Sequence, residues 1–141
     1  MLFRSVDLER RLDCKFEYCR GHVYAMSGAS FAHVYVHSNL MLHLGTRLAG
    51  TGCRAFGSDL RIHVEASDLY TYPDVSILCG PAAMTRRMAA TNPKVIFEIL
   101  SPSSRVYDAV GKFGLYQRIA TLEEYVLAEQ DSFLKIGRAH V

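Results

Sequence analysis

Apolar residues near the N-terminus recur at the spacing of an amphipathic helix. Leu8, Leu12 and Phe16 are four residues apart, so they would fall on one side of a helix. Gly21 follows them, and glycine commonly ends helices. The pattern therefore predicts a short amphipathic helix from Val6 to about Cys19.

A longer apolar stripe follows after a short strand and a turn. Residues 22–26, HVYAM, are expected to form the strand, and Ser30 suits the N-cap of a helix that runs to about Ala49. The residues of the stripe are Val36, Leu40, Leu44 and Leu48. Their spacing of four predicts the buried side of this helix.

The middle of the chain has the composition of β-strands. Residues 53–65 and 70–80 are two strand-like runs separated by a short polar turn, which predicts a hairpin. A polar loop over 81–93 then leads to the continuous apolar run KVIFEIL at 94–100. Such a run suits a central strand that is covered on both faces.

The last third of the chain predicts one helix and one strand. Ser103 or Ser104 in SPSS suits the N-cap of a helix over Arg105–Ile119, and EEYVLAE at 123–129 suits a closing strand. The helix residues expected near the sheet are Tyr107, Val110, Gly111, Gly114 and Leu115. The order of all these elements predicts an α/β sandwich, in which helices flank a mixed central sheet.

Length and composition indicate one ordinary globular domain. The chain has 141 residues, of which 50% are hydrophobic and 21% charged, and it contains no repeats or low-complexity runs. No apolar run approaches the length of a membrane span, so we expect a soluble, cytoplasmic protein. The formal net charge of +2 is too small to require a nucleic acid as partner.

The cysteines do not indicate a metal site. Cys14, Cys19, Cys53 and Cys79 show no C-x-x-C spacing, so a zinc site built from cysteine is disfavoured. Because a cytoplasmic location is expected, we predict four reduced thiols.

The C-terminal hexapeptide IGRAHV, Ile136–Val141, resembles one translated frame of a common sequencing adapter. We therefore assign residues 1–135 to the domain and expect the natural sequence to continue differently beyond that point. The residues of this tail, His140 included, are therefore not candidate functional residues.

Two strand-like runs each carry one acid. Asp74 follows Pro73 directly in YPDVSIL, and Glu98 is flanked by apolar residues in VIFEIL. A carboxylate in an apolar sheet needs a proton, a charged partner or a metal ion. Two carboxylates a few ångströms apart favour a hard divalent cation, because Mg²⁺ and Mn²⁺ prefer oxygen ligands. Lys112, in the next predicted helix, is placed to reach the same end of the sheet.

Each of these residues also has a purely structural explanation. Asp74 suits a turn at a strand edge, and Glu98 would also be satisfied by a buried arginine. A helix lysine such as Lys112 is usually solvated. His33 and His37 share a helix face as zinc ligands can, but the glutamate of a metalloprotease motif is missing, so capping or packing explains them as well.

Several segments occur in an order and at a spacing that resemble one known family. They are FEYCRGHVYAMSGAS, FGSDLRI, YPDVSIL, FEILSPSS, and YDAVGKFGLYQ followed by EEYVLAEQD. The chain resembles the Uma-two family of restriction endonucleases, within the PD-(D/E)XK nuclease superfamily. The resemblance extends over nearly the whole chain before the tail.

The resemblance implies a restriction-endonuclease-like fold and metal-dependent cleavage of DNA. It implies that Asp74 and Glu98 bind Mg²⁺ or Mn²⁺ and that Lys112 replaces the lysine that the superfamily usually carries where Leu100 stands here. It also implies Glu17, expected on the first helix, as a helper acid.

Asp108 matches the family as well, one helical turn before Lys112, and a supporting role is expected for it. If Lys112 points toward the strand end, its amine should lie within about 4 to 6 Å of the carboxylate of Asp74 or Glu98. At that separation opposite charges shift each other's pKa.

The function expected from the sequence is therefore that of a Mg²⁺-dependent endonuclease that acts on DNA. The alternative is a catalytically inactive module that keeps the nuclease fold and binds nucleic acid or protein, which the lack of a pronounced basic surface would favour. Small nucleases often cut as dimers, so a homodimer is one option that no sequence feature decides.

Overall fold

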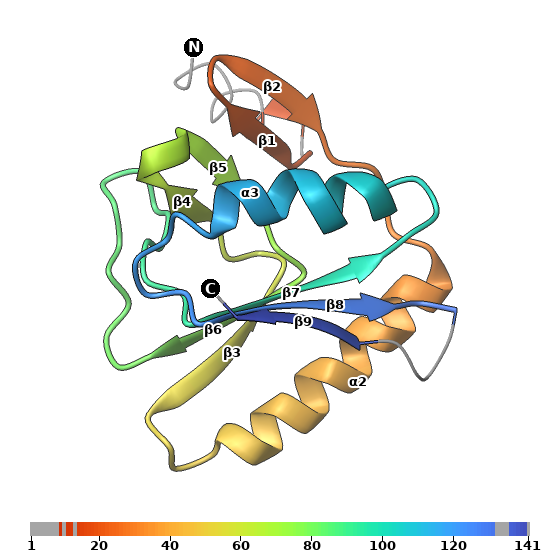
Figure 1. The fold of residues 1–141 in the computed structure, drawn as a ribbon, viewed down its shortest axis with the longest axis vertical. Coiled ribbons are helices and arrows are strands. Elements are labelled where there is room, and N and C mark those ends of the chain that lie inside the picture. The colour runs from red at the N-terminus through yellow and green to blue at the C-terminus, as the bar shows by residue number, and fades with distance from the viewer. Residues whose placement is uncertain (1–8, 10, 13, 132–135, 141) are drawn as a thin grey trace.

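Two β-sheets and the helices packed on them make up the protein, seen here in a computed structural model that describes residues 9, 11–12, 14–131 and 136–140 (Figure 1). The larger sheet has the order β3 (Cys53–Gly57), β6 (Val75–Cys79), β7 (Val95–Leu100), β8 (Glu124–Glu129) and β9 (Ile136–His140). The smaller sheet has the order β2 (His22–Ala25), β1 (Phe16–Cys19), β5 (Leu69–Thr71) and β4 (Ile62–Val64). Strands β7 and β8 are parallel and the other neighbours antiparallel, so the larger sheet is mixed, as predicted.

Helix α2 (Phe31–Leu48) lies on one side of the larger sheet, and α3 (Phe113–Tyr116) lies on the other (Figure 1). The predicted N-cap is confirmed, because the backbone N–H of His33 donates to Ser30 Oγ at 3.2 Å. The predicted stripe of α2 is only half-buried, and no described residue of this helix is fully buried. The outer side of α2 exposes Phe31, Val34, Tyr35 and Leu42.

The helix predicted over residues 105–119 ends earlier and has a different inward face. A π-helical segment, η2 (Tyr107–Lys112), leads into α3, which ends at Tyr116. Of the residues expected near the sheet, Leu115 packs against the core, whereas Val110 is 71% exposed and Tyr107 is 42% exposed. The buried residues are Asp108, Lys112 and Tyr116, which are spaced four apart. The inward face is therefore charged at Asp108 and Lys112, where Lys112 pairs with acids from both sheets, and it joins the hydrophobic core at Tyr116.

The helix predicted from Val6 to Cys19 is wrong over its last turn. Phe16–Cys19 form strand β1, which pairs with β2 through a two-residue turn at Arg20 and Gly21. Both turn residues have positive φ, 46° and 91°, which is the geometry that joins twisted antiparallel strands. Gly21 thus makes a hairpin turn and does not end a helix. Earlier in the predicted range Glu9, Arg11 and Leu12 are helical, Cys14 and Lys15 are not, and residues 6–8, 10 and 13 lie outside the described residues.

The two long strands predicted over 53–65 and 70–80 are each divided between the two sheets. The first divides into β3 and β4, and the second divides into β5 and β6 at Tyr72, Pro73 and Asp74. The predicted hairpin is formed only by β4 and β5, joined through a short 3₁₀ turn, η1 (Glu65–Ser67). The proline therefore interrupts the run, and Asp74 stands at the point where the chain enters the larger sheet.

The main hydrophobic core fills the space between the two sheets, under α3. Its members come from both sheets and from the segment around α3: Ile62, Val64, Leu69, Leu78, Ala90, Ile96, Tyr116, Ile119, Leu122 and Tyr125. The rings of Tyr116 and Tyr125 meet edge-to-face, with centroids 5.3 Å apart. This core fixes α3, and with it η2, against the face of β7 and β8.

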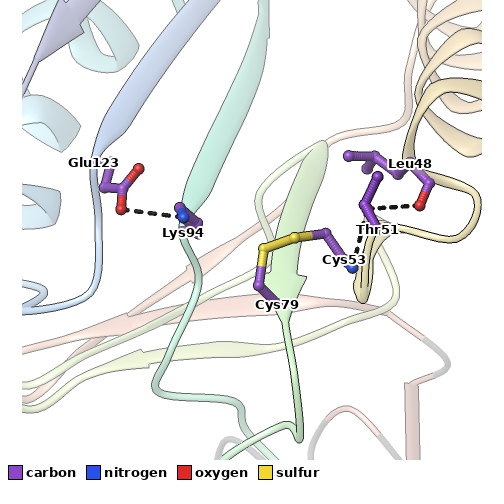
Figure 2. The surroundings of a disulfide bond; sticks show 6 residues. All are labelled: Leu48, Thr51, Cys53, Cys79, Lys94 and Glu123. Atoms are coloured by element: carbon purple, nitrogen blue, oxygen red, sulfur yellow. Dashed lines mark hydrogen bonds and ion pairs between the residues drawn. A yellow bond between two sulfur atoms is a disulfide. The ribbon is translucent and has the colours of Figure 1, made fainter.

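The prediction of four reduced thiols is wrong for two of the cysteines. Cys53 and Cys79 stand directly opposite each other on β3 and β6 and form a disulfide (Figure 2). The backbone N–H of Cys53 also donates to Thr51 Oγ1 at 3.2 Å, next to the end of α2. The pairing depends on strand register, which the spacing of cysteines does not reveal. Among the described residues Cys14 and Cys19 remain free.

The tail at Ile136–Val141 was expected to lie outside the domain. In the structure Ile136–His140 form β9, which pairs antiparallel with β8 from Glu124 to Ala128. The backbone of the tail is therefore part of the larger sheet, whatever the origin of its sequence. None of the helices within the described residues is long and apolar enough to cross a membrane.

Candidate functional site

Asp74 and Glu98 meet at one end of the larger sheet. Strands β6 and β7 pair Val75 with Phe97, and this antiparallel register places Asp74 opposite Glu98 one step further on. The backbone N–H of Ile99 donates to Asp74 Oδ2 at 2.7 Å, which holds the carboxylate against β7. The expectation that these two acids lie on adjacent strands is therefore confirmed.

Glu98 is 3% exposed and receives two hydrogen bonds on the same oxygen. Lys112 Nζ donates to its Oε1 at 3.0 Å, and the hydroxyl of Tyr116 donates to the same atom at 2.9 Å. Both donors come from the last helix, one turn apart. Glu98 also lines a pocket.

Lys112 lies closer to the acids than the 4 to 6 Å expected from the sequence. Its ammonium is buried among three carboxylates, with Nζ at 3.0 Å from Glu98, 3.1 Å from Asp108 and 3.3 Å from Glu17. Asp108 and Lys112 are both within η2, where the wider π-helical turn carries them to the same inward side. The predicted inward direction of Lys112 is confirmed.

Glu17 reaches this cluster from a strand and not from a helix. It is the second residue of β1 and is buried, and Thr71 Oγ1 from β5 donates to its Oε1. The smaller sheet therefore contributes one acid, the larger sheet contributes Glu98, and the last helix contributes Lys112 and Asp108. Three elements that are distant in sequence are thus joined at one point.

The acids open onto a pocket of about 760 Å³. Two serine-containing loops form part of its wall, residues 26–30 before α2 and 101–104 before the last helix. Ser101, Ser103 and Ser104 hydrogen-bond to one another at 2.9 to 3.1 Å, so the second loop is held compact. The volume lies within the range of about 300 to 1,000 Å³ that is common for small-molecule sites in proteins.

Comparison with known families identifies the chain. Residues 4–133 match the model of the Uma2 family, described as "Putative restriction endonuclease". The chain belongs to the Uma2 family. It is 37% identical over 124 residues to the protein slr1290 and 36% identical over 130 residues to sll1609, both from Synechocystis and both described as uncharacterized.

These alignments cover 88% and 87% of the chain but 65% and 73% of the two relatives, so the chain spans about two thirds of their lengths. The fold also resembles a crystal structure from Anabaena variabilis described as "a putative nuclease belonging to DUF820". The match has a TM-score of 0.65 and 16% sequence identity, and covers 92% of the chain and 78% of that structure. The restriction-endonuclease-like α/β fold predicted from the sequence is thereby confirmed.

His33 belongs to the same site of this Uma2 protein, although the sequence favoured no role for it. Its Nε2 donates to Asp74 Oδ1 at 3.0 Å, and His37, one turn later, donates to the backbone oxygen of Asp74 at 3.1 Å. Asp74 is therefore held by donors from both α2 and β7. The signal in the sequence is the four-residue spacing of the histidines after Ser30, which in the structure serves to contact Asp74.

Tyr116 was not singled out from the sequence. The sequence feature that could have identified it is its spacing, because Asp108, Lys112 and Tyr116 follow one another at intervals of four on the last helix. The side chain is fully buried, and its hydroxyl contacts Glu98. The hydroxyl of Tyr125 donates to the backbone oxygen of Asp108 at 2.7 Å and so supports the neighbouring turn.

The electrostatics of the site are governed by an excess of buried acids. Complete burial raises the pKa of Glu98 to about 8, with the Lys112 ammonium opposing this rise and the charges of Asp74 and Asp108 adding to it. Burial by itself would lower the pKa of Lys112, but the surrounding acids, Glu98 foremost, raise it well above its ordinary value. Lys112 therefore stays charged, while burial opposes the ionisation of Glu98 and the Lys112 ammonium favours it.

Asp74 and His33 form a second charged pair. Burial would raise the pKa of Asp74, but the hydrogen bonds from His33 and from the Ile99 backbone lower it below its ordinary value. The hydrogen bond to Asp74 raises the pKa of His33, against the effect of burial. Asp74 is therefore an ionised carboxylate at neutral pH.

The donor set fits a divalent cation with hard oxygen ligands. Asp74, Glu98, Glu17 and Asp108 place four carboxyl groups around one lysine and one histidine, so the site carries an excess of acid. Within the described residues no group of three or more histidine, cysteine or acidic side chains forms a ready metal centre. Mg²⁺ is commonly bound by only one or two carboxylates and keeps several waters, which agrees with a set of two.

Proposed function

We propose that the chain is the nuclease domain of a Mg²⁺-dependent endonuclease that hydrolyses phosphodiester bonds of DNA. The observation that supports this most directly is the meeting of Asp74, Glu98 and the Lys112 ammonium at one open pocket. Membership of the Uma2 family points to the same class of reaction. Mn²⁺ is expected to replace Mg²⁺, since both accept oxygen ligands.

Asp74 and Glu98 would hold the metal ion, which supplies Lewis-acid polarisation of the scissile phosphate and a more acidic water. The carboxylate of Asp74 is already oriented by the Ile99 backbone and by His33. The carboxylate of Glu98 is oriented through one oxygen by Lys112 and Tyr116. Both ligands would thus need little rearrangement on binding.

Lys112 would stabilise the negative charge that develops on the phosphoryl oxygens. A fixed ammonium at such a point typically contributes on the order of 10² to 10³ in rate. Glu17 and Asp108 would act on Lys112 and not on the phosphate, because both contact Nζ and keep the ammonium at the strand end. Glu17 is therefore proposed as a positioning residue of the catalytic site.

The test is cleavage of end-labelled DNA oligonucleotides, single-stranded and duplex, with Mg²⁺, with Mn²⁺, and with a chelator. The expected result is metal-dependent cleavage that Glu98→Gln and Lys112→Met both abolish. The matched control is Lys94→Met, which removes a lysine whose ion pair with Glu123 lies at the surface. Metal binding by calorimetry without cleavage under any condition would contradict the proposal and favour an inactive binding module.

A further inference from the structure

An exposed aromatic ring stands beside the acidic cluster on the smaller sheet. The β1–β2 pairing places Tyr24 directly opposite Glu17, so both side chains lie on the same face. Tyr24 lines the pocket and is 54% exposed. The ring of His22, two residues earlier on the same face, has its centroid 6.4 Å from that of Tyr24. Strand β2 thus carries a short aromatic row that ends at the pocket.

A second exposed ring enters the pocket from the last helix. Tyr107 lines the pocket and is 42% exposed, and its ring centroid lies 5.6 Å from Lys112 Nζ. The ring lies against Gly111, where an added Cβ would come within 2.8 Å of the ring atom Cδ2. Glycine at this position therefore lets the Tyr107 ring lie flat against the helix. One surface of the site is thus aromatic, while its centre is acidic.

The charges of the pocket do not suit duplex DNA. Proteins that bind duplexes gain affinity by neutralising many phosphates with lysine and arginine. Among the described residues, the lysines that line this pocket are Lys15 and Lys112, and both are engaged, Lys15 with Asp59 and Lys112 with three acids. The formal net charge of the whole chain is only +2. Binding energy for a nucleic acid must then come largely from contacts other than ion pairs.

We propose that the site takes single-stranded DNA, with unpaired bases stacked on Tyr24 and Tyr107 and the adjoining phosphodiester over Asp74 and Glu98. This inference rests on the proposed nuclease function and specifies its substrate. Stacking of a base on an aromatic ring contributes about 1 to 3 kcal/mol and is independent of sequence, because every base has a π-face. In a duplex the bases are paired and stacked on each other, so the two rings have nothing to bind.

The test measures binding of a fluorescent oligothymidylate and of the matching duplex by anisotropy. The whole chain is used with Ca²⁺, which takes the same kind of oxygen ligands as Mg²⁺. The expected result is that the single strand binds at least about tenfold more tightly than the duplex, and that Tyr24→Ala and Tyr107→Ala each weaken its binding about tenfold. Circular dichroism on each variant establishes that it is folded.

The matched control is Tyr35→Ala on α2. Tyr35 is 53% exposed, close to the value for Tyr24, but it does not line the pocket. Its replacement should leave binding of the single strand unchanged. Equal affinity for duplex and single strand, or equal effects of Tyr24→Ala and Tyr35→Ala, would overturn the inference.

The outcome is separable from the nuclease proposal. Metal-dependent cleavage of a duplex, together with a failure to prefer the single strand, would leave the nuclease proposal standing and reject the substrate proposed here. Tight binding of the single strand through both tyrosines without cleavage would support the proposed ligand and reject the nuclease proposal.

Discussion

Lys112 Nζ lies 3.0 Å from Glu98 Oε1, although the two residues belong to different elements of the fold. Asp108 and Glu17 also contact the ammonium, so one buried lysine joins the last helix to both sheets. The pairing makes Lys112 at once a proposed catalytic residue and a counter-charge for three acids. Its replacement is therefore expected to affect both stability and activity.

Lys112→Met should destabilise the fold in the absence of divalent ions. The change leaves three buried carboxyl groups without their cation, and breaking a buried ion pair in this way typically costs about 3 to 5 kcal/mol. Mg²⁺ should restore part of the loss and raise the melting temperature of the variant more than that of the wild type. Differential scanning fluorimetry with and without Mg²⁺ measures this, with Lys94→Met as the control. A variant as stable as the wild type without metal would show that the acids do not need Lys112.

Glu98 should make the protein less stable at alkaline pH. Its pKa is raised to about 8 by burial, so the folded protein keeps a proton that the unfolded chain releases near its ordinary value of 4.5. The stabilising contribution is therefore complete below about pH 4.5 and is lost as the pH rises through about 8. The raised pKa of His33 also makes the folded protein lose stability as the pH rises.

The measurement is the free energy of unfolding by urea across this pH range, without metal. The wild type should lose on the order of a few kcal/mol, and Glu98→Gln should flatten the curve because glutamine does not titrate. Glu123→Gln, at the surface, is the control and should keep the slope of the wild type. An unchanged slope in Glu98→Gln would assign the pH dependence to another group.

Tyr116→Phe should weaken metal binding through Glu98. The variant removes one hydroxyl that donates to Oε1, so the carboxylate is held by Lys112 alone. Tyr125→Phe is the matched control, because it removes a buried hydroxyl from the same cluster that contacts a backbone oxygen and not Glu98. Each variant should lose about 1 kcal/mol of stability, but only Tyr116→Phe should lower the affinity for Mn²⁺ in calorimetry. Equal affinities in the two variants would contradict a positioning role for Tyr116.

Reduction of the Cys53–Cys79 disulfide should lower stability without changing the site. The bond closes a segment of 26 residues, for which chain entropy predicts about 3 kcal/mol. Cys79 ends β6 while Asp74 precedes its start, so metal affinity should be unaffected. Urea unfolding of Cys53→Ser with Cys79→Ser tests this, with Cys14→Ser, a free exposed cysteine, as the control. If the double variant unfolds at the same urea concentration as the wild type, the bond contributes no stability.

The acids of the site were predictable because a charged side chain is unusual in an apolar strand. Asp74 and Glu98 stand out as charges in apolar runs, and such a conflict is visible in a single sequence. The resemblance to the family supplied the role of Lys112, which its position on a helix did not indicate. The structure adds that all three meet, which no one-dimensional pattern could establish.

Other parts of the site depended on contacts between distant segments. Glu17 was assigned to a helix because Leu8, Leu12 and Phe16 happen to share helical spacing, while the turn at Arg20 and Gly21 determined a hairpin. The spacing of the histidines suggested zinc, although His33 serves a carboxylate that lies 41 positions away along the chain. Such contacts depend on tertiary packing, so the sequence indicates them only weakly, through the periodic spacing of residues.

Strand β9 is the outermost strand of the larger sheet, and it pairs with the side of β8 that β7 leaves free. It covers one side of β8, a strand whose apolar residues Tyr125, Val126 and Ala128 are buried in the sheet. Without β9 that side of β8 would present a row of unpaired backbone N–H and C=O groups, which is a template for pairing with another chain. In a chain ending at Lys135 the edge of the sheet would move from β9 to β8, whose apolar residues would then border the open edge. Such a chain is expected to aggregate more readily than the whole chain, with growth of particle size in light scattering, even where its core and its acidic site stay intact.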